Sequence, residues 1–438
     1  MITGAGSGIG AGTAEAALQA GDRVVATGRN LDKVRTAWRD VASENLAFVQ
    51  LDVADEAQAQ AAVEEAVKHF ERIDVVVHNA GYSLLGHFEE MTTAEIERQF
   101  ATNFYGVIHV MRAVLLDVLY CGICHSDIHI VRSEWRPTRY PCVPGHEIIG
   151  RAQAVGSAVT QFKVGDIGGV GCRVDSCGTC ENCLADREQN CLNGTTFTYD
   201  STDRVTGGHT FGGYSDKVVV SERFVIRIPP GADLAATAPL LCAGITTFSP
   251  MQHWKLEAGQ RVGVISLGGL GHMAVKLAVA RRADVTVFTT SPSKIADARR
   301  LGAREAVLWS DDAAMKRHVN QFDLMIATVP KAFPMQPFMD LLTLDATLVN
   351  VGALDQLQGL NGTALGFGRK SLAGSMIGGI AETQEGIDYC AARNIKADIE
   401  LIRPEDINRA YEQVVNKDAR YRFVIDMASM KSVAGSKS

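Results

Sequence analysis

The sequence predicts an α/β protein in three parts: a doubly wound fragment, a turn-rich β domain and a second, complete doubly wound domain. Short β-branched runs alternate with Ala-rich segments in residues 1–116 and again in residues 243–381, as in parallel strands joined by crossover helices. Between them, from about Cys121 to Tyr214, Gly, Pro and Cys are frequent and apolar runs are short. A chain of 438 residues is also long enough for two or three domains.

In the first part, a glycine-rich turn, TGAGSGIG, is followed by segments that alternate between helix and strand patterns. The predicted helices are AGTAEAALQA (11–20) and DEAQAQAAVEEAVKHFER (55–72). The predicted buried strands are DRVVATG (22–28), LAFVQLD (46–52) and IDVVVHNA (73–80).

The last part repeats this alternation and ends in a different pattern. Its predicted helix is HMAVKLAVARR (272–282). Its predicted strands are RVGVIS (261–266), DVTVFTT (284–290), FDLMIAT (322–328) and ATLVNVG (346–352). The tail PEDINRAYEQVVNKDARYRFVID (404–426) predicts a helix followed by a strand.

Composition excludes several classes of function. Lys and Arg total 43 against 50 Asp and Glu, a net charge of −7, which argues against nucleic acid or an anionic membrane as the main partner. No apolar run is long enough for a membrane span, and no signal pattern opens the sequence, so a cytoplasmic location is expected. Most of the ten cysteines fall between Cys121 and Cys191, which in a reducing compartment indicates metal binding.

Four cysteines form the strongest single motif, C-x2-C-x2-C-x7-C, at Cys177, Cys180, Cys183 and Cys191. Such short spacings bring four thiolates onto one tetrahedral zinc ion. The alternative is four unrelated thiols, which their crowding within 15 residues makes improbable. A closed four-thiolate site leaves no open position, so the predicted role is structural.

An open, catalytic metal site needs three protein ligands and one exchangeable position. Candidates are Cys124 in CGICHSD, His146 in PGHE and Cys242 in PLLCAGITTF. Spacing alone does not link them, and a lone Cys in an apolar run is more often part of the core.

A family resemblance provides the link. In order along the chain, CGICHSDIH, GHEIIGRAQAVGSAV, the four-cysteine loop, LLCAGITTF, GGLGH, GSMIGGI and ADIELI resemble zinc-dependent medium-chain alcohol dehydrogenases, in particular the cinnamyl-alcohol-dehydrogenase-like branch of NADPH-dependent aldehyde reductases. The resemblance covers residues 117–428. It implies a GroES-like zinc catalytic domain at 117–242 and 382–438, with its first strands missing, and a complete Rossmann NADP-binding domain at 243–381.

Carried over residue by residue, the resemblance makes Cys124, His146 and Cys242 the ligands of the catalytic zinc. Glu147 is then a possible transient ligand beside the metal, and Asp127 orients His146 and fixes its tautomer.

The resemblance also implies a proton relay through Ser126 and His129, although His129 alone is equally compatible with a surface histidine. The implied reaction is hydride transfer between NADP(H) and a zinc-bound alkoxide, with a small alcohol or aldehyde as the other partner. The implied cofactors are one catalytic Zn2+, one structural Zn2+ and NADP(H). A homodimer is possible, since relatives are commonly dimers.

The dinucleotide loop SLGGLG departs from the family pattern, which has Gly where this chain has Ser266. A Cβ there is expected to crowd the tight first turn and to weaken cofactor binding. About twenty residues on, TTSPSK offers hydroxyls and a cation in place of an acid, which favours NADP over an ordinary polar loop. The expected cofactor-binding residues are Thr246, Gly268, Gly269, Leu270, Thr290, Ser291, Lys294 and Val351.

Residues 1–116 resemble the N-terminal half of a short-chain dehydrogenase, through the TGAGSGIG loop, Asp52, Asn79–Gly81 in the HNAG segment and Asn103. Arg29, after a strand without the usual acid, again suggests NADP. The resemblance ends before the catalytic Tyr-x-x-x-Lys pair of that family, and no tyrosine in the chain has a Lys four residues later. We therefore expect RAVLL (112–116) to be the end of a truncated helix and this unit at most to bind a dinucleotide.

The combined prediction is a zinc-dependent oxidoreductase that interconverts primary alcohols and aldehydes, aromatic or medium aliphatic, with NADP(H). The alternative is a catalytically silent chimeric fusion that keeps its structural zinc, with or without dinucleotide binding. A bifunctional enzyme is disfavoured because the short-chain catalytic pair is missing.

Overall fold

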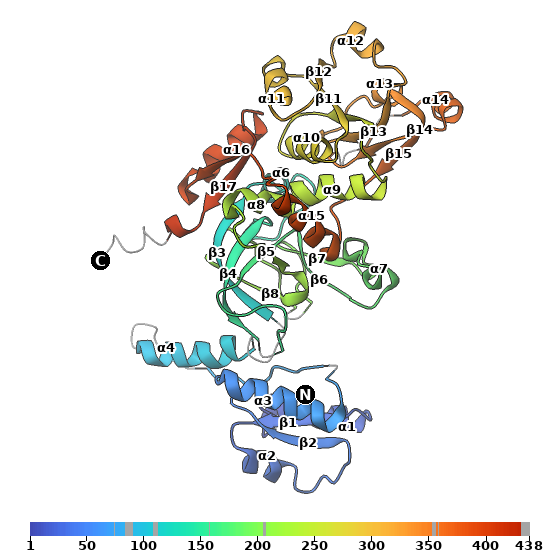
Figure 1. Cartoon of the computed structure of the whole chain (residues 1–438). Coiled ribbons are helices and arrows are strands. Elements are labelled where there is room, and N and C mark those ends of the chain that lie inside the picture. Colours follow the sequence, from blue (N-terminus) through green and yellow to red (C-terminus); the bar gives the residue numbers. More distant parts are fainter. Residues whose placement is uncertain are drawn as a thin grey trace. The chain divides into compact units, whose positions relative to one another are not determined.

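The structure is a computed structural model that describes residues 1–73, 75–83, 91–107, 113–156, 158–204, 207–352, 356–357 and 359–430 (Figure 1). It contains two compact units. The first comprises Met1–Leu116, Ala152–Asp166 and Val219–Glu222. The second comprises Asp117–Arg151, Ile167–Val218 and Arg223–Ser438, of which residues 431–438 lie outside the described part. The predicted domain limits remain a prediction.

The N-terminal part has the expected alternation of helices and strands, and β1 and β2 pair in parallel. The third predicted strand, around Val77, contributes only isolated bridge pairing with Ile2 among the described residues. Asp55 caps α3 by accepting the N–H of Gln58. The elements are α1 (Gly8–Gln19), β1 (Val24–Gly28), α2 (Leu31–Ala37), β2 (Leu46–Gln50), α3 (Glu56–Phe70), α4 (Thr93–Phe100) and the π-helix η2 (Ala101–Tyr105).

The segment predicted to end a helix is a strand, so that expectation is wrong. Residues Ala113–Gly122 form one ten-residue strand, β3, in which Val114, Leu115 and Leu116 are fully buried. A short apolar run does not distinguish helix from strand by its own pattern, and here pairing with neighbouring strands decides the outcome.

The turn-rich β domain is confirmed. In the described part of the chain, its main sheet has the order β16-β17-β3-β4-β5-β9, with β8 also paired to β3, so the tail of the chain returns to the strand that precedes the first cysteine cluster. Its elements are β3, α6 (His125–Val131), β4 (Ile148–Val155), β5 (Ile167–Val170), β6 (Arg173–Ser176), α7 (Glu181–Leu184), η3 (Glu188–Asn190), β7 (Thr195–Phe197), β8 (Lys217–Ser221), η4 (Glu222–Phe224), β9 (Ile226–Arg227), β16 (Ile399–Ile402), η7 (Pro404–Asp406), α16 (Ile407–Val415) and β17 (Arg422–Asp426).

The second α/β part is a parallel sheet in the order β12-β11-β10-β13-β14-β15, as expected of a complete doubly wound domain. The reversal of strand order beside β10 places the glycine-rich loop at the carboxyl edge of the sheet. Its elements and the adjoining helices are α8 (Leu234–Thr237), η5 (Ala238–Leu241), α9 (Ala243–His253), β10 (Arg261–Ile265), α10 (Gly271–Ala280), β11 (Asp284–Thr289), η6 (Pro292–Lys294), α11 (Ile295–Arg300), β12 (Glu305–Leu308), α12 (Asp312–Lys316), β13 (Phe322–Ala327), α13 (Gln336–Met339), β14 (Leu342–Asn350), α14 (Gly362–Gly368), β15 (Ser371–Gly374) and α15 (Ile380–Ala392).

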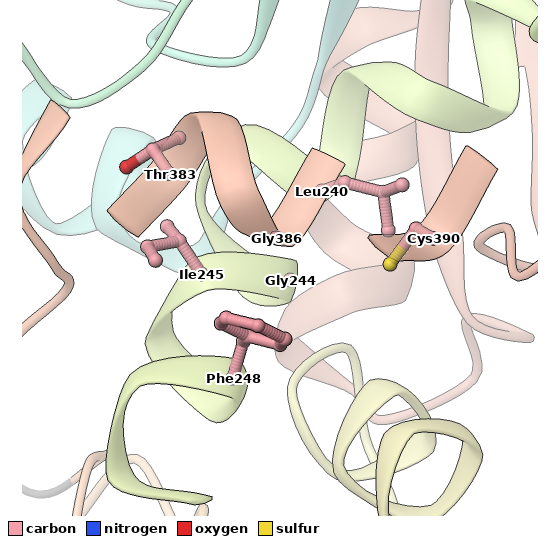
Figure 2. A pocket seen from close by; sticks show the side chains of 7 residues that line it. All are labelled: Leu240, Gly244, Ile245, Phe248, Thr383, Gly386 and Cys390. Carbon is pink, nitrogen blue, oxygen red and sulfur yellow. The ribbon is translucent and has the colours of Figure 1, made fainter. Parts of the chain in front are cut away.

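Helices α9 and α15 pack closely and leave a small apolar cavity of about 10 Å3 between them. Figure 2 shows its lining side chains, which are Leu240, Gly244, Ile245, Phe248, Thr383, Gly386 and Cys390. A space of this size holds at most one water molecule, so it is a packing gap and not a substrate site.

Among the described residues, no single helix has the length and apolar character of a membrane span. One pair of helices, Leu234–Leu241 and Ala243–His253, meets that criterion jointly by length and composition only, with a 55° bend between them.

Candidate metal centres and dinucleotide site

Four buried residues that are far apart in the sequence form one potential metal-binding cluster. The ligand atoms of Cys124, His146, Glu147 and Cys242 all lie within 4.8 Å of one another. The sulfurs of Cys124 and Cys242 are 3.9 Å apart. Tetrahedral zinc with Zn–S bonds of ~2.3 Å requires a separation of ~3.8 Å, so this donor set fits zinc.

Asp127 holds the two halves of this cluster in place. Cys124 precedes the first residue of α6, and its backbone N–H donates to Asp127 Oδ2 at 2.8 Å. The other carboxylate oxygen lies 3.0 Å from Nδ1 of His146 and accepts the N–H of Gly145 at 3.2 Å. The Nδ1–carboxylate contact leaves Nε2 of His146 available to a metal, which is the arrangement that the resemblance implies for Asp127.

The electrostatics of the cluster favour a cation. A hydrogen bond with Cys242 holds the pKa of Cys124 well below its ordinary value. Burial lowers the pKa of His146, but the charges of Asp127 and Cys172 and the hydrogen bonds with Asp127 and Cys124 together outweigh burial and raise that pKa well above its usual range. Surroundings that attract a proton this strongly also attract a metal ion, which takes the place of the proton.

Glu147 carries a buried charge next to these ligands. Burial raises the pKa of Glu147 to about 7, although the neighbouring Arg422 opposes the shift. One carboxylate oxygen is paired with Nη2 of Arg422, and the other, Oε2, has no partner among the described groups. The free oxygen suits the role of transient metal ligand. Sequence reasoning missed Arg422, which lies 275 positions from Glu147.

Cys172 is a further residue that the sequence did not assign to this cluster, since it was expected to be an ordinary core or surface thiol. A hydrogen bond with Cys242, together with the charge of His146, lowers the pKa of Cys172 to about 5. Cys172 is therefore a third thiol beside the predicted ligands. The spacing of Cys172 from the other cysteines in the sequence does not predict that it lies beside Cys242.

The expected proton relay lies on α6. Ser126 Oγ is 3.6 Å from the sulfur of Cys124. His129 is 7% exposed, and its ring stacks on Trp135, with 4.6 Å between ring centres. Its Nδ1 pairs with Glu134, a residue that the sequence analysis did not single out. This carboxylate orients the imidazole, and the part of Ser126 and His129 in proton transfer stays a prediction.

The four-cysteine loop folds into a second compact cluster. The ligand atoms of Cys177, Cys180, Cys183 and Cys191 lie within 4.8 Å of one another, and the sulfurs of Cys177 and Cys183 are 3.9 Å apart. Backbone hydrogen bonds, the strongest from Thr179, lower the pKa of Cys177 to about 5. Four sulfurs at this separation fit a structural zinc ion, which binds cysteines as thiolates.

The glycine-rich loop between β10 and α10 fits a dinucleotide, with one departure. A Cβ on Gly271 would lie 2.1 Å from the carbonyl oxygen of Ser266, so the turn requires glycine there, while Gly268 has open space. Ser266 has φ +78°, a backbone conformation that favours glycine, which accounts for the crowding expected from its Cβ.

The other expected cofactor residues border this loop or follow neighbouring strands. Leu270 and Gly269 adjoin the start of α10, Thr290 and Ser291 follow β11, Val351 follows β14, and Thr246 lies in α9. Their roles in cofactor binding stay a prediction.

In the N-terminal part, Asn79 closes the first glycine loop. Its Nδ2 donates to the carbonyl oxygens of Thr3 and Gly4 at 3.1 and 3.2 Å. A Cβ on Gly10 would lie 2.3 Å from the same nitrogen. Asn103 Oδ1 accepts the N–H of Tyr82 at 3.0 Å. These contacts reproduce the local structure expected of a short-chain dehydrogenase fragment without adding a catalytic pair.

Comparison with known proteins identifies each part. Residues 111–230 match the model of the alcohol dehydrogenase GroES-like domain, and residues 269–392 match that of the zinc-binding dehydrogenases. NADP-dependent alcohol dehydrogenase C 1 of Mycolicibacterium smegmatis is 50% identical over 320 residues, covering 73% of this chain and 91% of the relative. The chain belongs to the zinc-dependent alcohol dehydrogenase family.

Other comparisons agree with this assignment. Aldehyde reductase YahK of Escherichia coli is 50% identical over 315 residues, covering 72% of this chain and 90% of the relative. A solved cinnamyl alcohol dehydrogenase of Sorghum bicolor is 43% identical, with a TM-score of 0.71 and coverage of 72% and 90%. Residues 1–120 match the short chain dehydrogenase model, which overlaps the GroES-like match at residues 111–120.

These findings confirm the predicted family, fold class and type of enzyme for this dehydrogenase. Its homologues include NADP-dependent alcohol dehydrogenases and an aldehyde reductase, and both predicted zinc clusters are present in the structure.

Proposed function

We propose that this dehydrogenase interconverts primary alcohols and aldehydes with NADP(H), and that its substrates are aromatic or medium aliphatic. The main support for this proposal is the cluster of Cys124, His146, Glu147 and Cys242, whose ligand atoms lie within 4.8 Å of one another. Two thiolates and an imidazole form a three-ligand set of the kind that leaves one position open for substrate.

Zinc, when bound by Cys124, His146 and Cys242, supplies the positive charge that stabilises the negative charge developing on the substrate oxygen. Asp127 keeps His146 in the tautomer that presents Nε2, and Arg422 holds the Glu147 carboxylate beside the ligands. The two charged contacts keep the metal-binding atoms in position throughout the reaction.

The proton of the alcohol leaves along α6. Ser126 lies near the sulfur of Cys124 and accepts this proton through its hydroxyl. His129, on the same helix, would release this proton to solvent, and NADP(H), when bound, would supply hydroxyl groups for its passage between the two side chains. Glu134, paired with Nδ1 of His129, stabilises the charged imidazole during the transfer.

Aromatic side chains around the cluster support the assignment of substrate class. Tyr199 is 6% exposed, and its ring centre lies 5.8 Å from that of His146. Trp135, 41% exposed, stacks on His129. An aromatic ring beside the metal cluster and another beside the relay histidine suit an aromatic or aliphatic aldehyde. The cinnamyl alcohol dehydrogenase of Sorghum bicolor, with 43% identity, supports the same class.

The test is NADPH oxidation with benzaldehyde, measured for the wild type and for Cys124→Ser. We expect turnover in the wild type and loss of at least about 1,000-fold in the variant, because the variant lacks one ligand of the open site. Cys142→Ser is the matched control, since Cys142 is a free cysteine outside both clusters. Equal rates for Cys124→Ser and wild type would overturn the proposal.

Metal analysis separates this function from a silent fusion. The two clusters predict two zinc ions per wild-type chain and one in Cys124→Ser. A wild-type chain that retains only the structural zinc and does not turn over aldehydes would identify the chain as catalytically silent.

A further inference from the structure

Lys294 is the cation that the sequence offers to the 2'-phosphate of NADP, but its ammonium group faces another partner. Nζ donates a hydrogen bond to the carbonyl of Leu267 in the glycine-rich loop at 2.8 Å. The same nitrogen lies 5.9 Å from the centre of the Tyr421 ring, and Lys294 is 8% exposed. Lys294, which lies in the loop after β11 that we call the ribose loop, therefore braces the glycine-rich loop and turns its ammonium group away from solvent.

A second cation, Arg420, lies at that ribose loop and faces solvent. Its Nη2 donates to Ser293 Oγ at 3.4 Å, in the short η6 segment that follows β11. Its Nε is 3.0 Å from Asp297 Oδ2, and 41% of its side chain is exposed. The Asp297 contact holds the Nε edge of the guanidinium, so the Nη groups are presented at the serine side of the loop.

We propose that Arg420 supplies the positive charge that selects the 2'-phosphate of NADP(H), with Ser291 and Ser293 as hydroxyl donors. This inference rests on the proposed function, because it concerns the cofactor of that reaction. In a doubly wound domain, the loop after the second strand contacts the adenosine ribose, and β11 is that strand. A guanidinium is well suited to phosphate because it presents several N–H donors in one plane.

The local charges are compatible with an anion. Asp297 is shared between Arg420 and Arg300, whose Nε lies 3.7 Å from the other carboxylate oxygen. Lys294, Lys417 and Asp418 also lie at this corner of the fold, and Asp398 pairs with Nη1 of Arg300 at 2.9 Å. The cations here (Arg420, Arg300, Lys294, Lys417 and Lys276) outnumber the carboxylates (Asp297, Asp398 and Asp418), and a doubly charged phosphate can neutralise the excess.

Calorimetric titration of the full-length zinc-loaded protein with 2',5'-ADP and with 5'-AMP tests this assignment without turnover. We expect the wild type to bind 2',5'-ADP more tightly than 5'-AMP. Arg420→Gln is expected to weaken 2',5'-ADP binding about 10- to 100-fold, the loss typical of a charge-assisted hydrogen bond, with 5'-AMP affinity unchanged. Arg300→Gln is the matched control, because it removes a charge from the same Asp297 without contacting Ser293. Its 2',5'-ADP affinity should stay within about threefold of the wild type.

Three results would overturn the inference: no wild-type preference for 2',5'-ADP, wild-type affinity in Arg420→Gln, or an equal loss in Arg300→Gln. Lys294→Met provides a further contrast, since a brace of the glycine loop should weaken both ligands alike. A selective loss of 2',5'-ADP in Lys294→Met, with none in Arg420→Gln, would place the selecting charge on Lys294.

A parallel assay of NADPH oxidation with benzaldehyde separates this inference from the proposed function. Turnover that is unaffected by Arg420→Gln, in either NADPH or NADH, removes the inference and leaves the function intact. If the protein shows an Arg420-dependent preference for 2',5'-ADP but no turnover, the inference stands and the proposed function is overturned.

Discussion

Ser266 offers a direct test of how the dinucleotide loop departs from its family. Its φ of +78° lies in the region where a side chain costs about 1–2 kcal/mol relative to glycine. Ser266→Gly removes this strain but gives the unfolded chain extra freedom worth about 0.5–1 kcal/mol. The difference predicts a gain of about 0.5–1 kcal/mol in the free energy of unfolding, or a rise of about 1–3 °C in Tm.

The surrounding contacts indicate that the loop keeps its shape in this variant. The carbonyl of Ser266 accepts a hydrogen bond from Thr328 Oγ1 at 3.1 Å, and its N–H donates to the carbonyl of Phe288 at 2.8 Å. Both bonds use the backbone of residue 266 and persist in the glycine variant. Because the Cβ no longer crowds the pyrophosphate turn, we also expect the Kd for NADPH to fall severalfold.

The assay is chemical denaturation together with NADPH titration by fluorescence, for Ser266→Gly and Ser266→Ala. Alanine keeps the Cβ and removes only the hydroxyl, so Ser266→Ala should retain the strain and show no gain. Equal stabilisation in the two variants would refute backbone strain as the cause. A glycine variant that is less stable than the wild type would refute the reasoning altogether.

Three further variants test the metal centres and the relay. Asp127→Asn should weaken zinc binding at the catalytic cluster about 10- to 100-fold in a chelator competition and leave the four-cysteine zinc in place; loss of both ions together would contradict this. Glu134→Gln should lower kcat about 10-fold with zinc content unchanged, because it removes the charge paired with His129; an unaltered kcat across the pH range would contradict the relay. Cys180→Ser should cost one zinc per chain and lower the Tm, and a variant with full zinc content would exclude a four-thiolate site.

The structural zinc loop shows what can be predicted from local spacing alone. Cys177 and Cys191 are 14 positions apart, so the loop geometry largely dictates that their sulfurs meet. The catalytic cluster is different. Cys124 and Cys242 are 118 positions apart, and only the order of motifs in the family connected them before the fold was known.

Other parts of the site depend on tertiary contacts for which the sequence contains no local signal. Arg422 reaches Glu147 from β17, and Arg420, two residues earlier, reaches the ribose loop. Cys172 resembles an isolated core thiol until β6 and the start of α9 bring it next to Cys242. In each case the partner comes from a distant element, so the pairing is determined by the tertiary fold and by no short motif.

Strand β3 begins where the two family matches overlap and leads into the metal centre. Its last residues pair with β17 in the register Val424–Gly122 and Ile425–Cys121, which fixes the path of the chain into Cys124. The N–H of Gly122 donates to the carbonyl of Glu147 at 3.0 Å, and a Cβ on Gly122 would lie 2.0 Å from a carboxylate oxygen of Glu147.

The first residues of β3 are less constrained in residue type than those that lead into Cys124. Ala113–Leu116 need only be apolar and able to extend, because they fill the sheet interior and contribute no ligand. This explains how residues 111–120 can match two unrelated family models while the ligand geometry beyond them is preserved. From Cys121 onward, residue identity and strand register are both constrained. The pairing with β17 and the absence of a side chain at Gly122 together position Cys124 and Glu147.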